Sequence, residues 1–282
     1  MSEIQSCFKR YEKKYLLTQA QYEAMRLGMA PYMQPDAHPQ YSISNIYYDT
    51  DSYDLIRASL EKPIYKEKLR LRSYGVPGQR DTVFVEIKKK YDDVVYKRRI
   101  TMEMQAAALY LNGVPEEAAG QTISGLASFP SERQMANSGQ ANHGLPSNHQ
   151  TSNASQITRE IDYFLNLYQP RPRVFIAYDR EAYAAADGGE LRITFDTALR
   201  ARTNDLDLRL GDHGLPLLSD AYRLMEVKIP GTAPLWLARL LSANAIFPTS
   251  FSKYGAFYTK FLLGGKSANL PKEDLRKTRS AA

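Results

Sequence analysis

The segment Lys66-Glu67-Lys68-Leu69-Arg70-Leu71-Arg72 places a basic residue at every second position. Side chains of a β-strand point alternately to the two faces of a sheet, so this segment predicts a strand with one cationic and one largely apolar face. Residues 42–48 and 174–180 read as two more strands. The same alternation of charged and apolar positions recurs in residues 10–14, 83–88, 96–100, 191–196 and 225–229. The sequence therefore predicts about eight strands.

Segments with helical spacing fall between and after these strands. They cover residues 18–33, 53–60, 103–112, 115–128, 158–167, 234–241 and 252–263. Helices packed on the apolar side of the sheet would give an α+β fold. Residues 128–155 are rich in Ser, Asn, Gln and Gly and predict a mobile insertion, because strand patterns resume after them. We expect one domain over residues 1–265, followed by a polar, basic tail over residues 266–282.

The composition is that of an ordinary globular protein. The chain has 282 residues, a formal net charge of +6 and 43% hydrophobic residues. No apolar run approaches the ~18 residues of a membrane span, and the first residues do not resemble a secretory signal. Cys7 is the only cysteine, which excludes an internal disulfide and a cysteine zinc cluster. We expect a cytoplasmic protein with no membrane segment in this chain.

The charged sides of the predicted strands carry many more cations than anions. In a single strand such a face is ordinary solvated surface, but one sign concentrated over all strands destabilises the empty fold and predicts a polyanionic ligand. A sheet closed with this side inward would form a barrel around a cationic tunnel. Glutamates inside it could hold Mg²⁺ or Mn²⁺, which take oxygen ligands. The cations are Arg10, Lys14, Lys66, Lys68, Arg70, Arg72, Lys88, Lys90, Lys97, Arg99, Arg180, Arg192 and Lys228, against Glu12, Glu86 and Glu226.

Nucleic acid is the obvious competing polyanion. Surfaces that bind single strands interleave aromatic side chains with basic ones on the same face, for base stacking. Most of the twenty tyrosines are expected elsewhere, with Tyr48 and Tyr178 as the candidates for the charged face. The sequence contains no helix-turn-helix, zinc-finger or RNP signature. We therefore expect no nucleic-acid partner.

Nine short motifs occur in one order along the chain and together resemble the catalytic domain of the VTC (vacuolar transporter chaperone) family. This family lies within the triphosphate tunnel metalloenzyme superfamily. The resemblance runs from about residue 8 to residue 263 and is interrupted by the predicted insertion. The motifs are Arg10-x-Glu12-x-Lys14-Tyr15, Ile46-Tyr47-Tyr48-Asp49, residues 68–75, Glu86-Ile87-Lys88, Lys97-x-Arg99, residues 178–183, Arg192-Ile193-x-Phe195-Asp196, Glu226-Val227-Lys228 and residues 250–254.

The resemblance implies a closed, antiparallel, eight-stranded β-barrel with a charged lumen, flanked by helices. It also implies an ATP-dependent phosphotransferase, a polyphosphate polymerase that uses Mn²⁺ or Mg²⁺. Such an enzyme passes the γ-phosphate of ATP to the end of a growing polyphosphate chain and releases ADP. The attacking oxygen belongs to the acceptor phosphate, so catalysis would consist of positioning and charge neutralisation.

The motifs also assign roles to individual residues. Glu226 would ligate the metal, and the charge pattern adds Glu86 and Glu12 as further metal candidates. Tyr178 and Ser252 would donate to phosphate oxygens, and Arg99 and Lys228 would add to substrate binding. Since Lys88 and Lys228 each follow a glutamate by two residues, ion pairing is an alternative for both. The residues that would grip phosphates are Lys14, Arg70, Arg72, Lys88, Lys97, Arg180, Arg192 and Lys253.

One departure from the superfamily pattern discriminates among activities. Its hydrolases and cyclases usually begin with Glu-x-Glu-x-Lys, whereas this chain has Arg10 in place of the first glutamate. A missing carboxylate should weaken metal-dependent activation of water, which favours the polymerase. The alternatives are a tunnel-type hydrolase of triphosphate or polyphosphate, and a non-catalytic polyphosphate-binding module. Coupling of synthesis to membrane transport would require a separate membrane partner.

Overall fold

The computed structural model describes residues 11–92, 94–113, 148–229 and 231–263. The strands are β1 (Tyr11–Thr18), β2 (Met33–Asp49), β3 (Tyr65–Tyr74), β4 (Thr82–Tyr91), β5 (Val94–Glu103), β6 (Arg171–Ala185), β7 (Arg192–Arg202), β8 (Leu215–Pro216), β9 (Tyr222–Ile229) and β10 (Pro248–Thr249). The helices are α1 (Gln19–Met29), α2 (Asp54–Leu60), α3 (Met104–Leu111), α4 (Asn148–Tyr168), α5 (Leu235–Ala243) and α6 (Lys253–Phe257). A 3₁₀ turn, η3 (Leu208–Leu210), and a π turn, η4 (Tyr258–Leu262), complete the described elements.

All strands belong to one antiparallel sheet of ten strands in the order β10-β1-β9-β7-β6-β2-β3-β4-β5, with β8 paired to β7. The expected closed eight-stranded barrel is wrong, because the sheet is open between its end strands. In the described part of the chain β5 pairs with β4 alone, and the two-residue β10 takes up part of the outer edge of β1. Alternation fixes which face a side chain occupies, whereas closure depends on strand tilt and register, which alternation does not encode.

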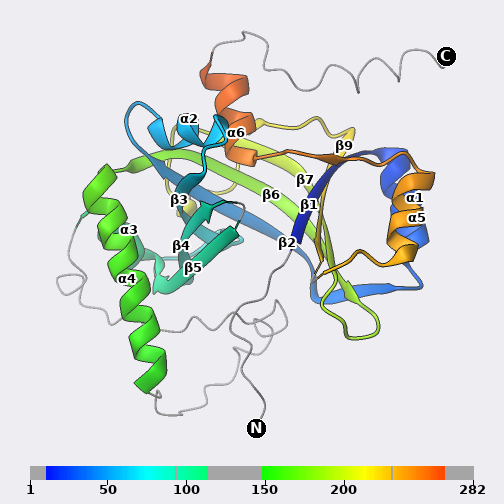
Figure 1. Cartoon of the computed structure of the whole chain (residues 1–282). Helices are drawn as coiled ribbons and strands as arrows, with labels where there is room; N and C mark the ends of the chain where they lie inside the picture. Colours follow the sequence, from blue (N-terminus) through cyan, green and yellow to red (C-terminus); the bar gives the residue numbers. More distant parts are fainter. Residues whose placement is uncertain (1–10, 93, 114–147, 230, 264–282) are drawn as a thin grey trace.

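The two faces of the sheet differ as the alternation predicts. On the outer face, α3 and α4 pack on β3, β4 and β5, while α1 and α5 lie side by side over β1, β7 and β9 (Figure 1). Buried Leu69, Leu71 and Ile87 belong to the first of these cores, and buried Leu17 and Val227 to the second. We call the opposite side, which carries the charged residues of the alternating strands, the polar face.

Part of the polar face is covered by α2 and α6, which lie together at the top of Figure 1. Tyr254 and Phe257 of α6 pack on apolar side chains of β2 and β6. The carboxylate of Asp49, at the end of β2, is fully buried and holds both helices in place. It accepts hydrogen bonds from the backbone N–H groups of Leu55 and Ile56 and, at 2.8 Å, from the hydroxyl of Tyr254. One carboxylate thus anchors both helices to the sheet.

Several helix bounds differ from the expected ones. The helix expected over residues 158–167 starts earlier, at Asn148, so the end of the expected insertion is helical. Ser, Thr, Asn and Gln are only modestly unfavourable in a helix, and the apolar stripe of residues 157–168 sustains it. The rest of the expected insertion, the helix over residues 115–128 and the tail lie outside the described residues. None of the described helices is both long and apolar enough to traverse a lipid bilayer.

Candidate functional site

A first cluster of charged side chains surrounds two carboxylates of the polar face, Asp196 on β7 and Glu226 on β9. The guanidinium of Arg180 donates to both oxygens of Asp196, at 2.6 and 2.8 Å, and to Oε2 of Glu226 at 3.0 Å. Lys253 Nζ lies 2.6 Å from Asp196 Oδ2 and 3.2 Å from Glu226 Oε1. Lys14 Nζ lies 3.5 Å from the same Glu226 oxygen. We call these five residues the Asp196 cluster.

Strand register and helix packing bring the Asp196 cluster together. Arg180 lies opposite Asp196 across β6 and β7, and Lys14 lies opposite Glu226 across β1 and β9. Lys253 comes from the first turn of α6, a place where a cation is normally unfavourable because of the helix dipole. The two carboxylates offset that cost. The cluster therefore depends on β1, β6, β7, β9 and α6 being assembled at once.

The charges of the Asp196 cluster stabilise one another. Burial alone would raise the pKa of Glu226, but the positive charges of Lys253, Arg180 and Lys14 outweigh burial and hold that pKa well below its usual range. Conversely, burial would lower the pKa of Lys253, but Asp196 and Glu226 raise it above its usual value. Glu226, Lys253 and Arg180 therefore stay charged at neutral pH, since the pKa of Arg180 is also raised, against its burial, by Asp196 and Glu226.

A second cluster, which we call the Glu86 cluster, surrounds the buried carboxylate of Glu86 on β4. Arg70 Nε and Nη2 each lie 2.6 Å from Glu86 Oε2, while Lys97 Nζ lies 3.1 Å and Arg72 Nη1 3.7 Å from Oε1. Burial would raise the pKa of Glu86, but Arg70, Arg72 and Lys97 together hold it well below its usual range. Three cations share one carboxylate, so this cluster has an even larger surplus of positive charge.

Neutral side chains orient the two arginines of the Glu86 cluster. Arg70 Nη1 donates to the hydroxyl of Tyr47 at 3.2 Å, and Arg72 Nε donates to Oδ1 of Asn45 at 3.0 Å. The ring of Tyr47 stacks on that of Tyr254, with 4.9 Å between centroids. Since Tyr254 follows Lys253 in α6, this short helix contributes to the Asp196 cluster directly and supports the Glu86 cluster through Tyr47.

Further lysines of the polar face lie close to other cations. Lys68 on β3 lies opposite Lys88 on β4, and Lys88 lies opposite Lys97 on β5. Burial, reinforced by Lys66, Lys88 and Lys14, lowers the pKa of Lys68 to about 7. Burial also lowers the pKa of Lys97 to about 7, in spite of Glu86. Like charges directly across a sheet are destabilising, so this arrangement indicates a place for an anion.

Comparison with known proteins identifies the family of the chain. The sequence pattern of the VTC domain matches residues 9–262. The chain belongs to the VTC domain family. Within this VTC domain the resemblance seen in the short motifs is thus confirmed over nearly the whole chain.

Relatives of this VTC domain are much longer proteins. Vacuolar transporter chaperone complex subunit 4 of Schizosaccharomyces pombe is 24% identical over 234 residues, which are 76% of this chain and 31% of the relative. The subunit of the same name from Trypanosoma brucei brucei is 24% identical over 234 residues, 75% of this chain and 27% of the relative. The chain therefore spans less than a third of the length of these relatives.

Two solved structures show a distant likeness to this VTC domain. A protein of Pyrococcus horikoshii OT3 has a TM-score of 0.41 and 11% identity, over 89% of this chain and 99% of that one. A Hippeastrum protein with a dominant triphosphatase activity has a TM-score of 0.43 and 13% identity, over 88% of this chain and 94% of that one. Likeness at this level is too loose to bear on function.

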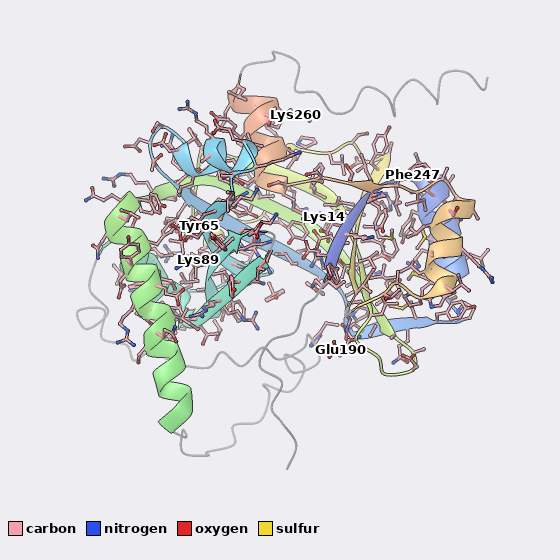
Figure 2. The ribbon with its side chains drawn as sticks, viewed as in Figure 1. Lys14, Tyr65, Lys89, Glu190, Phe247 and Lys260 are labelled. Carbon is pink, nitrogen blue, oxygen red and sulfur yellow. The ribbon has the colours of Figure 1, made fainter. Side chains whose placement is uncertain are left out.

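Most of the residues predicted for the site meet on the polar face of the VTC domain. Glu12 lies beside the Asp196 cluster, with Oε1 3.4 Å from Lys14 Nζ, and Lys88 lies close enough to Glu12 for the two charges to interact. Figure 2 shows Lys14 near the middle of the molecule, whereas Lys260 and Phe247 lie at its periphery. The predicted residues that belong to the two clusters are Lys14, Arg70, Arg72, Glu86, Lys97, Arg180, Glu226 and Lys253.

The other predicted residues have different surroundings. Arg192 donates to the backbone carbonyls of Gly189 and Leu191 in the turn between β6 and β7, so it contributes to neither cluster. Arg99 lies over the ring of Phe84. The ring of Tyr178 lies 4.2 Å from Lys253 Nζ, and Lys228 lies opposite Glu12 and Arg192. The side chain of Ser252 caps α6 by accepting the N–H of Gly255.

Sequence reasoning missed Asp196 as a site residue. The signal was present, because Arg192, Thr194 and Asp196 alternate on one side of a predicted strand and Asp196 falls within a family motif. Lys68 was placed on the charged face but was not assigned to the site. Tyr47 falls within the motif Ile46-Tyr47-Tyr48-Asp49 but was given no role there, and Asn45 carried no signal of its own; the role of both depends on packing between β2 and β3. Arg10 lies outside the described residues.

The expected placement of aromatic residues also needs correction. Tyr48 belongs to the outer core rather than to the polar face, because the alternation of β2 places its neighbour Tyr47 inward. Tyr178 does lie on the polar face. Tyr74 and Phe84 share the side of β3 and β4 that carries Arg72 and Glu86, so the polar face holds more aromatic residues than expected.

The carboxylates near Lys14 have the chemistry for a divalent cation. No group of three His, Cys, Asp or Glu side chains that could hold a metal occurs among the described residues. Glu12 and Glu226, from neighbouring strands, both lie within 3.5 Å of Lys14 Nζ, and the side chain of Glu12 is 39% exposed. Two carboxylates fit a cation that takes its remaining ligands from phosphate and water, as Mg²⁺ usually does. Glu86 fits this role less well, because it is the single carboxylate of its cluster.

Proposed function

We propose that the polar face binds ATP and an inorganic polyphosphate chain and transfers the γ-phosphoryl group of ATP to the chain end. The surplus of cations carries this proposal. The Glu86 and Asp196 clusters hold six cations against three carboxylates; beside them, Lys68 and Lys88 add two cations and Glu12 adds one carboxylate. Membership of the VTC domain family, whose relatives include vacuolar transporter chaperone subunits, supports it.

The proposed reaction needs no nucleophile from the protein. An oxygen of the terminal phosphate of the chain forms a bond to the γ-phosphorus, the bond between that phosphorus and the bridging β-oxygen breaks, and ADP leaves with the electron pair. Negative charge is spread over the transferred oxygens and the leaving group, so fixed cations around both would lower the barrier. Water does not take part.

Individual residues would divide the work. The guanidinium groups of Arg70 and Arg72 are oriented by Glu86, Tyr47 and Asn45 and would hold phosphate oxygens in a fixed geometry. Lys68 and Lys97 would regain full charge when a phosphate replaces their solvent, since an anion raises the pKa of a lysine. A divalent cation at Glu12 and Glu226 would supply charge neutralisation at bridging phosphate oxygens when bound.

Incubation of the purified chain with ATP and Mn²⁺, followed by a polyphosphate-stained gel, tests the proposal. The matched variants are Lys14→Ala and Lys13→Ala. Lys14 lies in the Asp196 cluster, whereas Lys13, its neighbour on β1, is exposed and points to the other face. We expect a ladder of growing chains with the wild type and Lys13→Ala, and a loss of at least tenfold with Lys14→Ala.

The other outcomes select the competing functions. Phosphate release without chain growth would replace the polymerase by a hydrolase. Tight, salt-sensitive binding of polyphosphate without turnover under Mn²⁺ or Mg²⁺ would leave a non-catalytic binding module.

We further propose that the chain acts together with a separate partner subunit and on the side of the membrane where ATP is supplied. The support is that the longer relatives from Schizosaccharomyces pombe and Trypanosoma brucei brucei are named as subunits of a complex. Cross-linking in intact cells followed by isolation of the chain tests this: recovery of the chain by itself would contradict it.

A further inference from the structure

Three aromatic side chains form a continuous group on the polar face, which we call the aromatic ledge. The ring of Tyr74, at the end of β3, meets the ring of Tyr41 at 5.5 Å and the ring of Phe84 at 5.6 Å, both edge to face. Tyr74 is 37% exposed, whereas Phe84 is buried. The ledge therefore presents an accessible ring that is held in place by two others.

The aromatic ledge adjoins residues assigned to phosphate binding. Phe84 lies directly opposite Arg72 across β3 and β4, and Tyr41 lies opposite Arg180 across β2 and β6. The guanidinium carbon of Arg99 lies 4.7 Å from the centroid of the Phe84 ring. An aromatic surface thus ends where the cationic surface begins.

The order of residues along β4 gives this boundary a direction. Phe84, Glu86 and Lys88 follow one another on the polar face, at about 3.4 Å per residue. The strand therefore leads from an aromatic ring, past the Glu86 cluster, to the lysines that lie opposite other lysines. A molecule with a flat apolar group at one end and several phosphates at the other matches that order.

We propose that the aromatic ledge binds the base of the nucleoside triphosphate, with the phosphates extending from Arg72 towards Lys88. This inference rests on the proposed function of the polar face. The π-face of Tyr74 would stack on the base. Arg99 would contact the edge of the base or the α-phosphate. The γ-phosphate would then point towards Lys68, Lys88 and Lys97, which leaves the lysine side of the face for the acceptor chain.

Calorimetric titration with two ligands tests the ledge, because only one of them has a base. ATP and inorganic tripolyphosphate would each be titrated, with Mg²⁺, into the wild type, Tyr74→Ala, Tyr74→Phe and Tyr91→Ala. Tyr91 is an exposed tyrosine of β4 that lies on the outer face, so it serves as the matched control. We expect Tyr74→Ala to weaken ATP about tenfold and tripolyphosphate less than twofold. Tyr74→Phe, which keeps the ring, and Tyr91→Ala should bind both ligands like the wild type.

The ledge and the proposed function can fail separately in this design. Equal loss of both ligands in Tyr74→Ala, or no loss of ATP, would overturn the ledge even if the wild type makes polyphosphate. The expected binding pattern in a wild type that makes no polyphosphate would support the ledge and overturn the polymerase. A wild type that binds tripolyphosphate but not ATP would overturn both.

Discussion

The ammonium group of Lys253 lies 2.6 Å from Oδ2 of Asp196, so the first residue of a short helix is held by a carboxylate of the sheet beneath it. Asp196 also accepts hydrogen bonds from Nε and Nη2 of Arg180. Lys253 and Arg180 thus share this anion as well as Glu226. Asp196 is thus the residue that turns three separate elements into one cationic surface.

Replacing Asp196 by Asn should destabilise the protein and impair phosphate binding. The substitution preserves volume but leaves Arg180 and Lys253 buried with one anion fewer, and breaking a buried ion pair costs about 3–5 kcal/mol. Urea denaturation should show a lower midpoint, and added tripolyphosphate should restore stability more strongly than in the wild type, because it supplies the missing charge. Asp220→Asn, at an exposed loop carboxylate, is the control. An unchanged midpoint would contradict the role of Asp196.

Stability should rise with pH between about 7.5 and 9. The folded-state pKa of Lys68 and Lys97 is lowered to about 7, mainly by burial, whereas an unfolded lysine titrates near about 10.4. Below pH 7 both states hold the proton and the folded state bears the full cost of the buried charge. As the pH rises, the folded state releases protons that the unfolded state still holds, so unfolding becomes less favourable.

Denaturation midpoints measured between about pH 7.5 and 9 test whether stability rises with pH. The double variant Lys68→Met with Lys97→Met should lose much of the rise. Saturating polyphosphate should flatten it as well, because the bound anion keeps both lysines protonated. A wild type whose stability falls steadily from pH 7.5 to 9 would contradict the assignment.

Tyr254→Phe should raise the activation free energy of phosphoryl transfer by more than it lowers the free energy of unfolding. The hydroxyl of Tyr254 donates to the buried carboxylate of Asp49, and hydrogen bonds to charged groups contribute about 1.5–3 kcal/mol. Its loss loosens α6 and so misplaces Lys253, while the stack on Tyr47 is preserved. The measurement is kcat and KM for ATP beside the urea midpoint. Tyr258→Phe, in the turn that follows α6, is the control; equal effects of both variants would argue against positioning through Asp49.

Glu12→Gln should raise the Mn²⁺ concentration needed for activity and leave the stability of the protein nearly unchanged. Glu12 is more exposed than the carboxylates of the two clusters. Its neutralisation should therefore change the free energy of unfolding by no more than about 0.5 kcal/mol. If it shares a divalent cation with Glu226, the Mn²⁺ concentration for half-maximal activity should rise several-fold, and chelation should abolish activity in both proteins. The same Mn²⁺ requirement in Glu12→Gln and wild type would remove Glu12 from the metal site.

The sequence predicted only parts of the longest strands, residues 42–48 of β2 and 174–180 of β6, but it predicted most of the charged clusters, because alternation at Arg70 and Arg72 assigns faces without knowledge of partners. It did not predict the open sheet, since local alternation does not encode whether the end strands β10 and β5 pair with each other. Arg192 illustrates a second limit: it lies on the expected strand, but its guanidinium turns to nearby backbone carbonyls. Tyr48 shows how a strand extended to Asp49 can place aromatic neighbours on opposite faces.

The short helix α6 both covers apolar side chains of β2 and β6 and carries Lys253 into the Asp196 cluster. The docking of α6 on the sheet therefore also completes the anion site, so the two share one equilibrium. Any anion that binds Lys253 only in its docked position must lower the equilibrium constant for opening of α6, and the opening of α6 must weaken binding of that anion by the same factor. Amide hydrogen exchange in residues 253–257 becomes a direct readout of occupancy, at a distance from the transferred phosphate.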